Sequence, residues 1–122
     1  MLEEKIQAVL KGAASITAIA GDRITPMQMR QTPIYPAVVY QRVAGNRENH
    51  VRGYANLENA IIQIDAWAVT LAGAIALGDA ITTAMYAATA FAAILPGSPV
   101  DTWEDDVKKY RRSMDWSVWN RE

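Results

Sequence analysis

The most regular pattern in the chain lies between residues 59 and 85, where an alternation of side chains leads directly into a helical period. Ile62, Ile64, Ala66 and Ala68 occupy every second position, so a strand here would present one unbroken apolar face. The opposite face carries a glutamine and an aspartate among apolar residues. The pattern therefore predicts a strand of a sheet that is covered fully on one face and partially on the other.

A helix is predicted directly after this strand. Thr70 stands where an N-cap belongs, because its hydroxyl can accept a hydrogen bond from a free amide of the first turn. The residues that then recur at helical spacing are Leu71, Ala74, Ile75, Gly78, Ile81, Thr82 and Met85. This face is narrow and built largely from small residues, so we expect the helix to lie close to the sheet.

The N-terminal part predicts another helix and two more strands. One face of the helix is marked by Leu2, Ile6, Val9, Leu10 and Ala13. Gly12 is expected to end or kink it, and Ser15 to cap a further short turn. Residues 23–26 predict a short edge strand, because Pro26 cannot donate to a ladder of hydrogen bonds, and residues 37–43 predict a second strand.

A polar stretch bounded by glycines follows at residues 45–56 and is too long for a tight hairpin turn. We predict a loop here. Loops of this length inside compact domains are usually functional or mobile, and we expect this one to be mobile in the isolated protein. Its candidate partner-binding residues are Arg47, His50, Arg52 and Tyr54. Because Glu48 is interleaved with the arginines, a protein partner is favoured over nucleic acid.

The C-terminal part predicts a hairpin. Residues 100–103 form its outgoing strand and residues 110–119 its returning strand, with acidic residues near the turn. On the returning strand Met114, Trp116 and Val118 are expected to face one way. Before the hairpin, an apolar stretch ends at a Pro-Gly-Ser-Pro run.

Composition adds limits to this α+β pattern. A chain of 122 residues, 51% of them hydrophobic, predicts a single domain spanning residues 1–122. The net charge of −1 gives no general electrostatic reason to bind nucleic acid or an anionic membrane. Without cysteine there is neither a disulfide framework nor a thiolate zinc site. The acidic start of the chain is unlike a signal peptide, so we expect synthesis in the cytosol.

The stretch between Ala66 and Leu95 is long enough to span a membrane and has Asp79 as its only charge. That carboxylate, near the middle, would cost about 2.5–3.5 kcal/mol on insertion scales, and a strand pattern runs into the stretch. We therefore favour a helix in a domain that does not span the membrane. Its uncharged outer face either meets another subunit or is an alanine-rich face left in water.

Residues that carry chemistry are few. His50 is the only histidine and has no candidate nucleophile beside it, so we predict no catalytic, cofactor or metal site. An acidic turn followed by a basic strand lacks the glycine and the ligand spacing of a calcium loop. It is a possible subunit interface instead, formed by Asp101, Glu104, Asp105, Asp106, Lys108 and Lys109.

Four segments, taken in order, resemble the tail-completion, or tail-terminator, proteins of long-tailed bacteriophages and prophages. They are IAGDRI at 19–24 with Pro26, YPAVVY at 35–40, IIQIDAWA at 61–68 and YRRSMDWSVW at 110–119. Gly73 departs from the family, where an acidic residue often completes a capping box. The arginine-rich loop varies among relatives, so its residues cannot be carried over from them.

The resemblance implies an α+β fold, with a mostly antiparallel sheet and helices on one face. It also implies a non-enzymatic ring, hexameric in the best-known relatives, that seats on the finished tail tube, halts its growth and joins the head. The expected partners are further copies of the chain, the tube protein and a head–tail connector protein, with DNA only as passing cargo and no membrane. The expected locations are the bacterial host cytoplasm during assembly and then the virion tail.

Two alternatives remain at this point. One is a monomeric α+β domain that binds a small ligand or a peptide. The other is a head-side connector component, of similar size but built more from helices.

Overall fold

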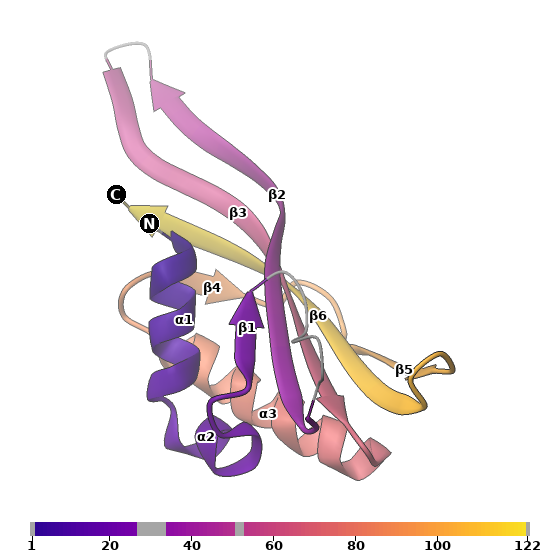
Figure 1. The fold of residues 1–122 in the computed structure, drawn as a ribbon. Helices are drawn as coiled ribbons and strands as arrows, with labels where there is room; N and C mark the ends of the chain where they lie inside the picture. Colours follow the sequence, from indigo (N-terminus) through magenta and orange to yellow (C-terminus); the bar gives the residue numbers. More distant parts are fainter. Residues whose placement is uncertain (1, 27–33, 51–52, 122) are drawn as a thin grey trace.

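The computed structural model describes residues 2–26, 34–50 and 53–121, and of residues 44–50, 53–58 and 121 only the backbone. Within these residues, helices α1 to α3 lie on one face of a six-stranded, mostly antiparallel sheet, as predicted for an α+β fold (Figure 1). The strand order is β1-β2-β3-β6-β4, and β5 also pairs with β6. The elements are α1 (Leu2–Gly12), α2 (Ala14–Ala20), β1 (Ile24–Pro26), β2 (Ala37–His50), β3 (Gly53–Ala68), α3 (Leu71–Ala87), β4 (Ala92–Ile94), β5 (Val100–Glu104) and β6 (Lys109–Arg121).

Strand β3 is the inner strand that the alternation predicts. It pairs antiparallel with β2 on one edge and with β6 on the other. Ile62, Ile64, Ala66 and Ala68 are all buried beneath the helices, which confirms the predicted apolar face. Asp65, on the opposite face, is also buried, with 7% of its surface exposed.

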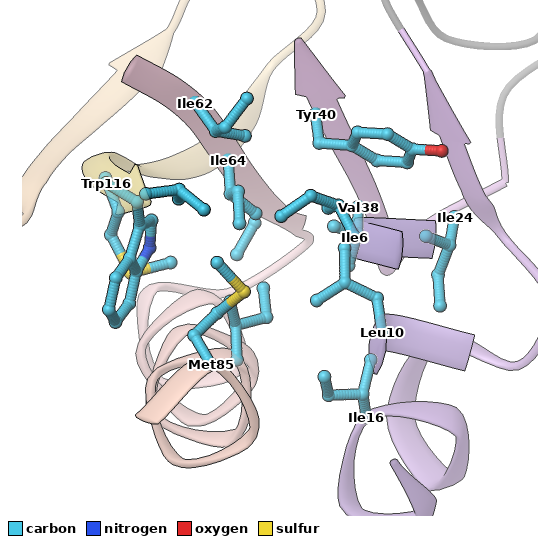
Figure 2. Close-up of a cluster of buried hydrophobic side chains, with 14 of the residues drawn as sticks. Ile6, Leu10, Ile16, Ile24, Val38, Tyr40, Ile62, Ile64, Met85 and Trp116 are labelled. Carbon is cyan, nitrogen blue, oxygen red and sulfur yellow. The ribbon is translucent and has the colours of Figure 1, made fainter. Parts of the chain in front are cut away.

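The core lies between this face and the helices. Met114, Trp116 and Val118 of β6 are buried on the same side, as predicted. Figure 2 shows Ile6 and Leu10 of α1 and Met85 of α3 in one cluster with Ile62, Ile64 and Trp116 of the sheet. Burying such side chains contributes about 1.5–3 kcal/mol each, so this layer supplies most of the drive to fold.

Polar contacts fix α1 on the sheet at three points, one of which is the hydrogen bond that the Tyr40 hydroxyl donates to Gln7 Oε1. The Nζ of Lys5 donates a hydrogen bond to the Oδ1 of Asn120 at 2.6 Å, and Asn120 is fully buried at the end of β6. Glu3 pairs with Arg42 of β2, with 2.9 Å between Oε2 and Nε. Because a buried amide is costly without a partner, the contact with Lys5 makes the position of α1 specific.

Helices α1 and α2 differ from expectation in one detail. Gly12 ends α1 as predicted, but the prediction that Ser15 caps the next helix is wrong. Ala13 is the N-cap, and its carbonyl oxygen accepts from the amides of Ile16 and Thr17. The interruption is a single extended residue, so α2 begins before Ser15 is reached.

Helix α3 begins where the sequence places it. Thr70 Oγ1 accepts a hydrogen bond from the Gly73 amide at 3.0 Å, which confirms the N-cap. Leu77, absent from the predicted face, is buried, whereas Leu71 is 42% exposed. Since β3 ends at Ala68, the first turn of α3 has less sheet beneath it.

The prediction of a loop at residues 45–56 is wrong. Strands β2 and β3 continue through it, in a register that places Arg47 opposite Glu58 and His50 opposite Gly53. Backbone pairing does not require apolar side chains, and this polar stretch has no apolar alternation to detect. We call residues 44–50 and 53–58 the β2–β3 ribbon, and Figure 1 shows it projecting beyond the helices.

The sheet edges are partly as expected. Strand β1 is an edge strand, as Pro26 indicates, and pairs parallel with β2. Strand β4 was not predicted, because its three residues lie in an apolar stretch with no turn signal before it. It pairs with Ser117–Trp119 of β6, and the predicted hairpin of β5 and β6 is confirmed.

The central position of β3 gives a stability prediction. Ile64→Ala should lower the free energy of unfolding by about 2–5 kcal/mol, because it leaves a cavity in the middle of the core. Urea unfolding followed by circular dichroism measures the change. Ile94→Ala removes the same atoms from the exposed strand β4 and should cost far less. An equal effect of the two substitutions would contradict the position assigned to β3.

Candidate functional site

The β2–β3 ribbon carries the predicted partner-binding residues. Arg47 and His50 lie on β2, and Tyr54 lies on β3 opposite Asn49. Arg52 lies outside the described residues, and of the other three only the backbone is described. The backbone therefore brings Arg47, His50 and Tyr54 to the far half of one projecting ribbon (Figure 1). Their role in binding stays a prediction.

Among the described residues, no strand lies beside the β2 edge of the ribbon. Strand β1 pairs only with Val38–Tyr40 of β2, so the backbone groups of β2 beyond Tyr40 meet no further strand among the described residues. Exposed strand edges are templates for pairing with another chain. The ribbon therefore offers backbone donors and acceptors along its free edge in addition to its charged side chains.

The β5–β6 hairpin carries the second predicted surface, and an ion pair within the chain already engages part of it. Arg112 donates from Nε to Asp101 Oδ1 at 2.8 Å and from Nη2 to Oδ2 at 3.2 Å. Its Nη1 lies 3.2 Å from Oδ1 of Asp79 on α3. Arg112 thus ties the hairpin to the helix, and its two-pronged bond with Asp101 is the geometry in which a guanidinium binds most specifically.

Gly78 makes room for this arginine. A Cβ at position 78 would overlap the Cδ of Arg112, which crosses α3 at that point. The sequence signal was available: Arg112 falls on the helix-facing side of β6 with Met114 and Trp116, and Asp79 is the only charge on α3. An arginine on that side needs an acidic partner there.

The pair is ionised over a wide pH range. The hydrogen bond from Arg112 lowers the pKa of Asp101, against the opposing effect of partial burial. The same hydrogen bond raises the pKa of Arg112 further above its usual value. Asp101 is therefore committed to a contact inside the chain and is a poor candidate for binding a neighbour.

A second cluster lies on the face of the sheet that the helices leave open. Arg111 Nη2 is 2.9 Å from Glu104 Oε1, and Nη1 is 3.6 Å from Asp65 Oδ2. Asp65 also accepts hydrogen bonds from Gln63 Nε2 at 3.1 and 3.2 Å. The buried carboxylate thus has the donors that its position requires. Glu104, like Asp101, is engaged inside the chain.

The tip of the hairpin keeps the remaining charges. Asp105, Asp106 and Lys108 are exposed, and no ion pair among the described residues includes them. Lys109 instead places its Nζ 5.1 Å from the centre of the Tyr35 ring, a cation–π contact. Of the six residues predicted as a subunit interface, the three tip residues are therefore the best placed to meet a partner.

Neither a metal centre nor a membrane-spanning helix is found in the described part of the chain. Its residues contain no group of three or more histidine, cysteine, aspartate or glutamate side chains placed to hold a metal ion. Within the same residues, none of the helices has the length and hydropathy needed to cross a bilayer.

Comparison with known proteins gives a family and a fold. The family model described as "Tail completion protein gp17" matches residues 4–120. Among solved structures, a chain of "Virion of native gene transfer agent (GTA) particle" is similar, with a TM-score of 0.72 and 11% identity. The match covers 97% of this chain and 92% of that chain, and at this identity it shows the fold alone. None of the curated proteins matches.

The contact between Gly78 and Arg112 gives a prediction about coupling. Gly78→Ala gains helix propensity, worth about 1 kcal/mol, but displaces the arginine from Asp101 and Asp79. In an Arg112→Ala background the displacement is gone, so the same substitution should stabilise by about 0.5–1 kcal/mol. A double-mutant cycle of urea unfolding measures the difference. The same effect of Gly78→Ala in both backgrounds would contradict the contact.

The lowered pKa of Asp101 gives a prediction about pH. A carboxylate with a lowered folded-state pKa stabilises the fold above its unfolded pKa, and this contribution is lost as the pH falls through the folded value. Asp101→Asn should therefore cost stability near neutral pH, by less than about 1 kcal/mol because solvent screens the pair. In acid, wild type and variant should converge in urea unfolding. A cost that persists at low pH would refute this account, and Asp115→Asn on the same sheet is the control.

Proposed function

Because the chain belongs to the family of tail completion protein gp17 and is a structural protein of phage tails, we propose that it caps the finished tail tube. Several copies form a ring there, end the growth of the tube and provide the surface that joins the head. The match of the family model to residues 4–120 carries this proposal, because it covers nearly the whole domain.

The proposed partners follow from this role. They are further copies of the chain, in a ring that we expect to be a hexamer, the tube protein and a head–tail connector protein. DNA passes the ring as cargo only, and the role involves no catalysis and no cofactor. Assembly takes place in the cytoplasm of the bacterial host, before the protein becomes part of the virion tail.

The β2–β3 ribbon supports this role as the element that meets the tube. It projects beyond the helices, and the outer edge of β2 has no neighbouring strand beyond Tyr40 among the described residues (Figure 1). A strand edge can extend a sheet of the tube protein, while Arg47 and Arg52 supply charge-assisted hydrogen bonds to acceptors there. Because the ribbon lies outside the helical layer, engaging the tube leaves the fold unchanged.

The ribbon gives a prediction about tail length. Replacing both arginines, Arg47→Ala with Arg52→Ala, should leave the urea unfolding midpoint unchanged, because the hydrophobic core of the described residues includes neither of them. In a phage or prophage background, the variant should produce tails of uneven or excessive length that fail to join heads. Tail lengths are measured by electron microscopy and infectious yield by plaque count.

A matched control lies on the same ribbon. Glu48→Ala with Glu58→Ala removes two acidic groups in place of two basic ones and should leave tail length nearly normal. Normal tails and yield from the arginine variant would remove the ribbon from the mechanism. Uniform tails after deletion of the whole gene would overturn the proposed function itself. A protein that stays monomeric and does not bind tail tubes would instead support the alternative of a domain that binds a small ligand or a peptide.

A further inference from the structure

The tip of the β5–β6 hairpin exposes large apolar side chains. Trp103 is 48% exposed and Val107 is 42% exposed, and we call these two residues the hairpin anchor. The ring of Trp103 lies 4.8 Å from that of Tyr110, measured between centroids, so its position is fixed before any partner arrives. Tryptophan is among the residues that most often carry the binding energy of protein interfaces.

A shallow groove, widely open to solvent, lies at the other end of the helical layer. It has a volume of about 360 Å³, and its lining includes Ala8, Val9 and Gly12 from the end of α1 and Ala84, Ala88 and Thr89 from the end of α3 and beyond. We call it the α1–α3 groove. No charged side chain lines it, whereas a site for a small metabolite usually offers several converging polar groups. The lining therefore suits an apolar side chain from another protein.

The anchor and the groove cannot meet within one copy. The anchor lies beyond the start of α3 and the groove at its end, and a helix of 17 residues is about 25 Å long. Figure 1 shows the β5 hairpin and α1 at opposite ends of the molecule. Two different patches at opposite ends are what a head-to-tail contact between copies requires.

The net charges beside the two patches are opposite in sign, because two exposed aspartates outweigh the exposed Lys108 at the hairpin tip and a lysine lies beside the groove. Asp105 and Asp106 flank the anchor at the hairpin tip. Lys11 lies between the lining residues Ala8 and Gly12 of the groove, on the same turn of α1. Lys11 and the two aspartates are exposed, and no ion pair among the described residues includes them. They are therefore available to each other across an interface.

We propose that the hairpin anchor of one copy docks in the α1–α3 groove of the next, with Asp105 and Asp106 opposite Lys11. This inference rests on the proposed ring and names the surfaces that build it. Because the contact joins unlike patches, an open chain of copies keeps one free anchor at one end and one free groove at the other until the ring closes. Trp103 supplies the buried contact area, and the charges set the orientation.

Crosslinking tests this directly, because the chain has no cysteine of its own. One variant carries Gly12→Cys, where a side chain meets nothing within 4 Å, and another carries Val107→Cys. The two are mixed, seated on tail tubes and treated with a short bismaleimide. A crosslinked dimer of the two variants is expected, and a chain with both cysteines should give a ladder. Ile94→Cys in place of Gly12→Cys is the control and should give neither.

Substitutions provide an independent measurement. Gly12→Leu places a side chain in the groove, at a position where a Cβ meets nothing within 4 Å, and Trp103→Ala removes the anchor. Each should lower the occupancy of tube ends about tenfold or more at limiting protein concentration. Lys11→Glu should also weaken assembly, and combining it with Asp105→Lys and Asp106→Lys should restore it. A purely structural role for these residues would not give such a rescue. Unfolding midpoints confirm that each variant folds.

The outcomes separate this inference from the function on which it rests. If wild type seats on tubes and ends their growth, but no crosslink forms and the variants assemble normally, the docking is overturned and the function stands. Crosslinks from Gly12→Cys to the tube protein would also overturn it, because the groove would then hold another partner. If wild type does not bind tubes, the proposed function falls and this inference falls with it.

Discussion

The constraint on which the structure depends is that β3 is paired along both edges while only one of its faces is covered by helices. Burying Ile62, Ile64 and Ala66 requires a helical layer, and both α1 and α3 pack on that side. The other face must then tolerate water, and it does so through Gln63, Asp65 and the ion pairs of Arg111. The asymmetry leaves one layer for stability and leaves the other sheet face and the sheet edges for contacts.

The sequence predicts those parts of the fold that have one buried face and one exposed face. The alternation at residues 62–68, the N-cap at Thr70 and the buried face of β6 are all confirmed, because each depends on burial or on a local hydrogen bond. The ribbon was missed because its sequence is polar and has no apolar alternation, whereas the pairing there joins backbone groups. Strand β4 was missed because three residues carry too little pattern.

The candidate site could be predicted in part, for a similar reason. The sequence identified the acidic and basic residues of the hairpin, but not which of them form ion pairs within the chain. Asp101 pairs with Arg112, and Glu104 pairs with Arg111. Only the fold brings these residues of β5 and β6 together and adds Asp79 of α3 as a second partner of Arg112. Asp105, Asp106 and Lys108 remain at the tip beside Trp103, and no ion pair among the described residues includes them.

The ribbon, the hairpin tip and the groove do not compete for the same residues. The β2–β3 ribbon projects past one end of the sheet, the hairpin tip lies at the other end, and the α1–α3 groove lies in the helical layer (Figure 1). A chain that must hold two neighbours and a tube at once needs such separation, because an interface used by one contact is lost to the others. The short, internally paired hairpin can act as a rigid anchor, since Arg112 ties it to α3 and Tyr110 packs on Trp103. The proposed ring would then be held by stiff elements, and the ribbon would be left to engage the tube.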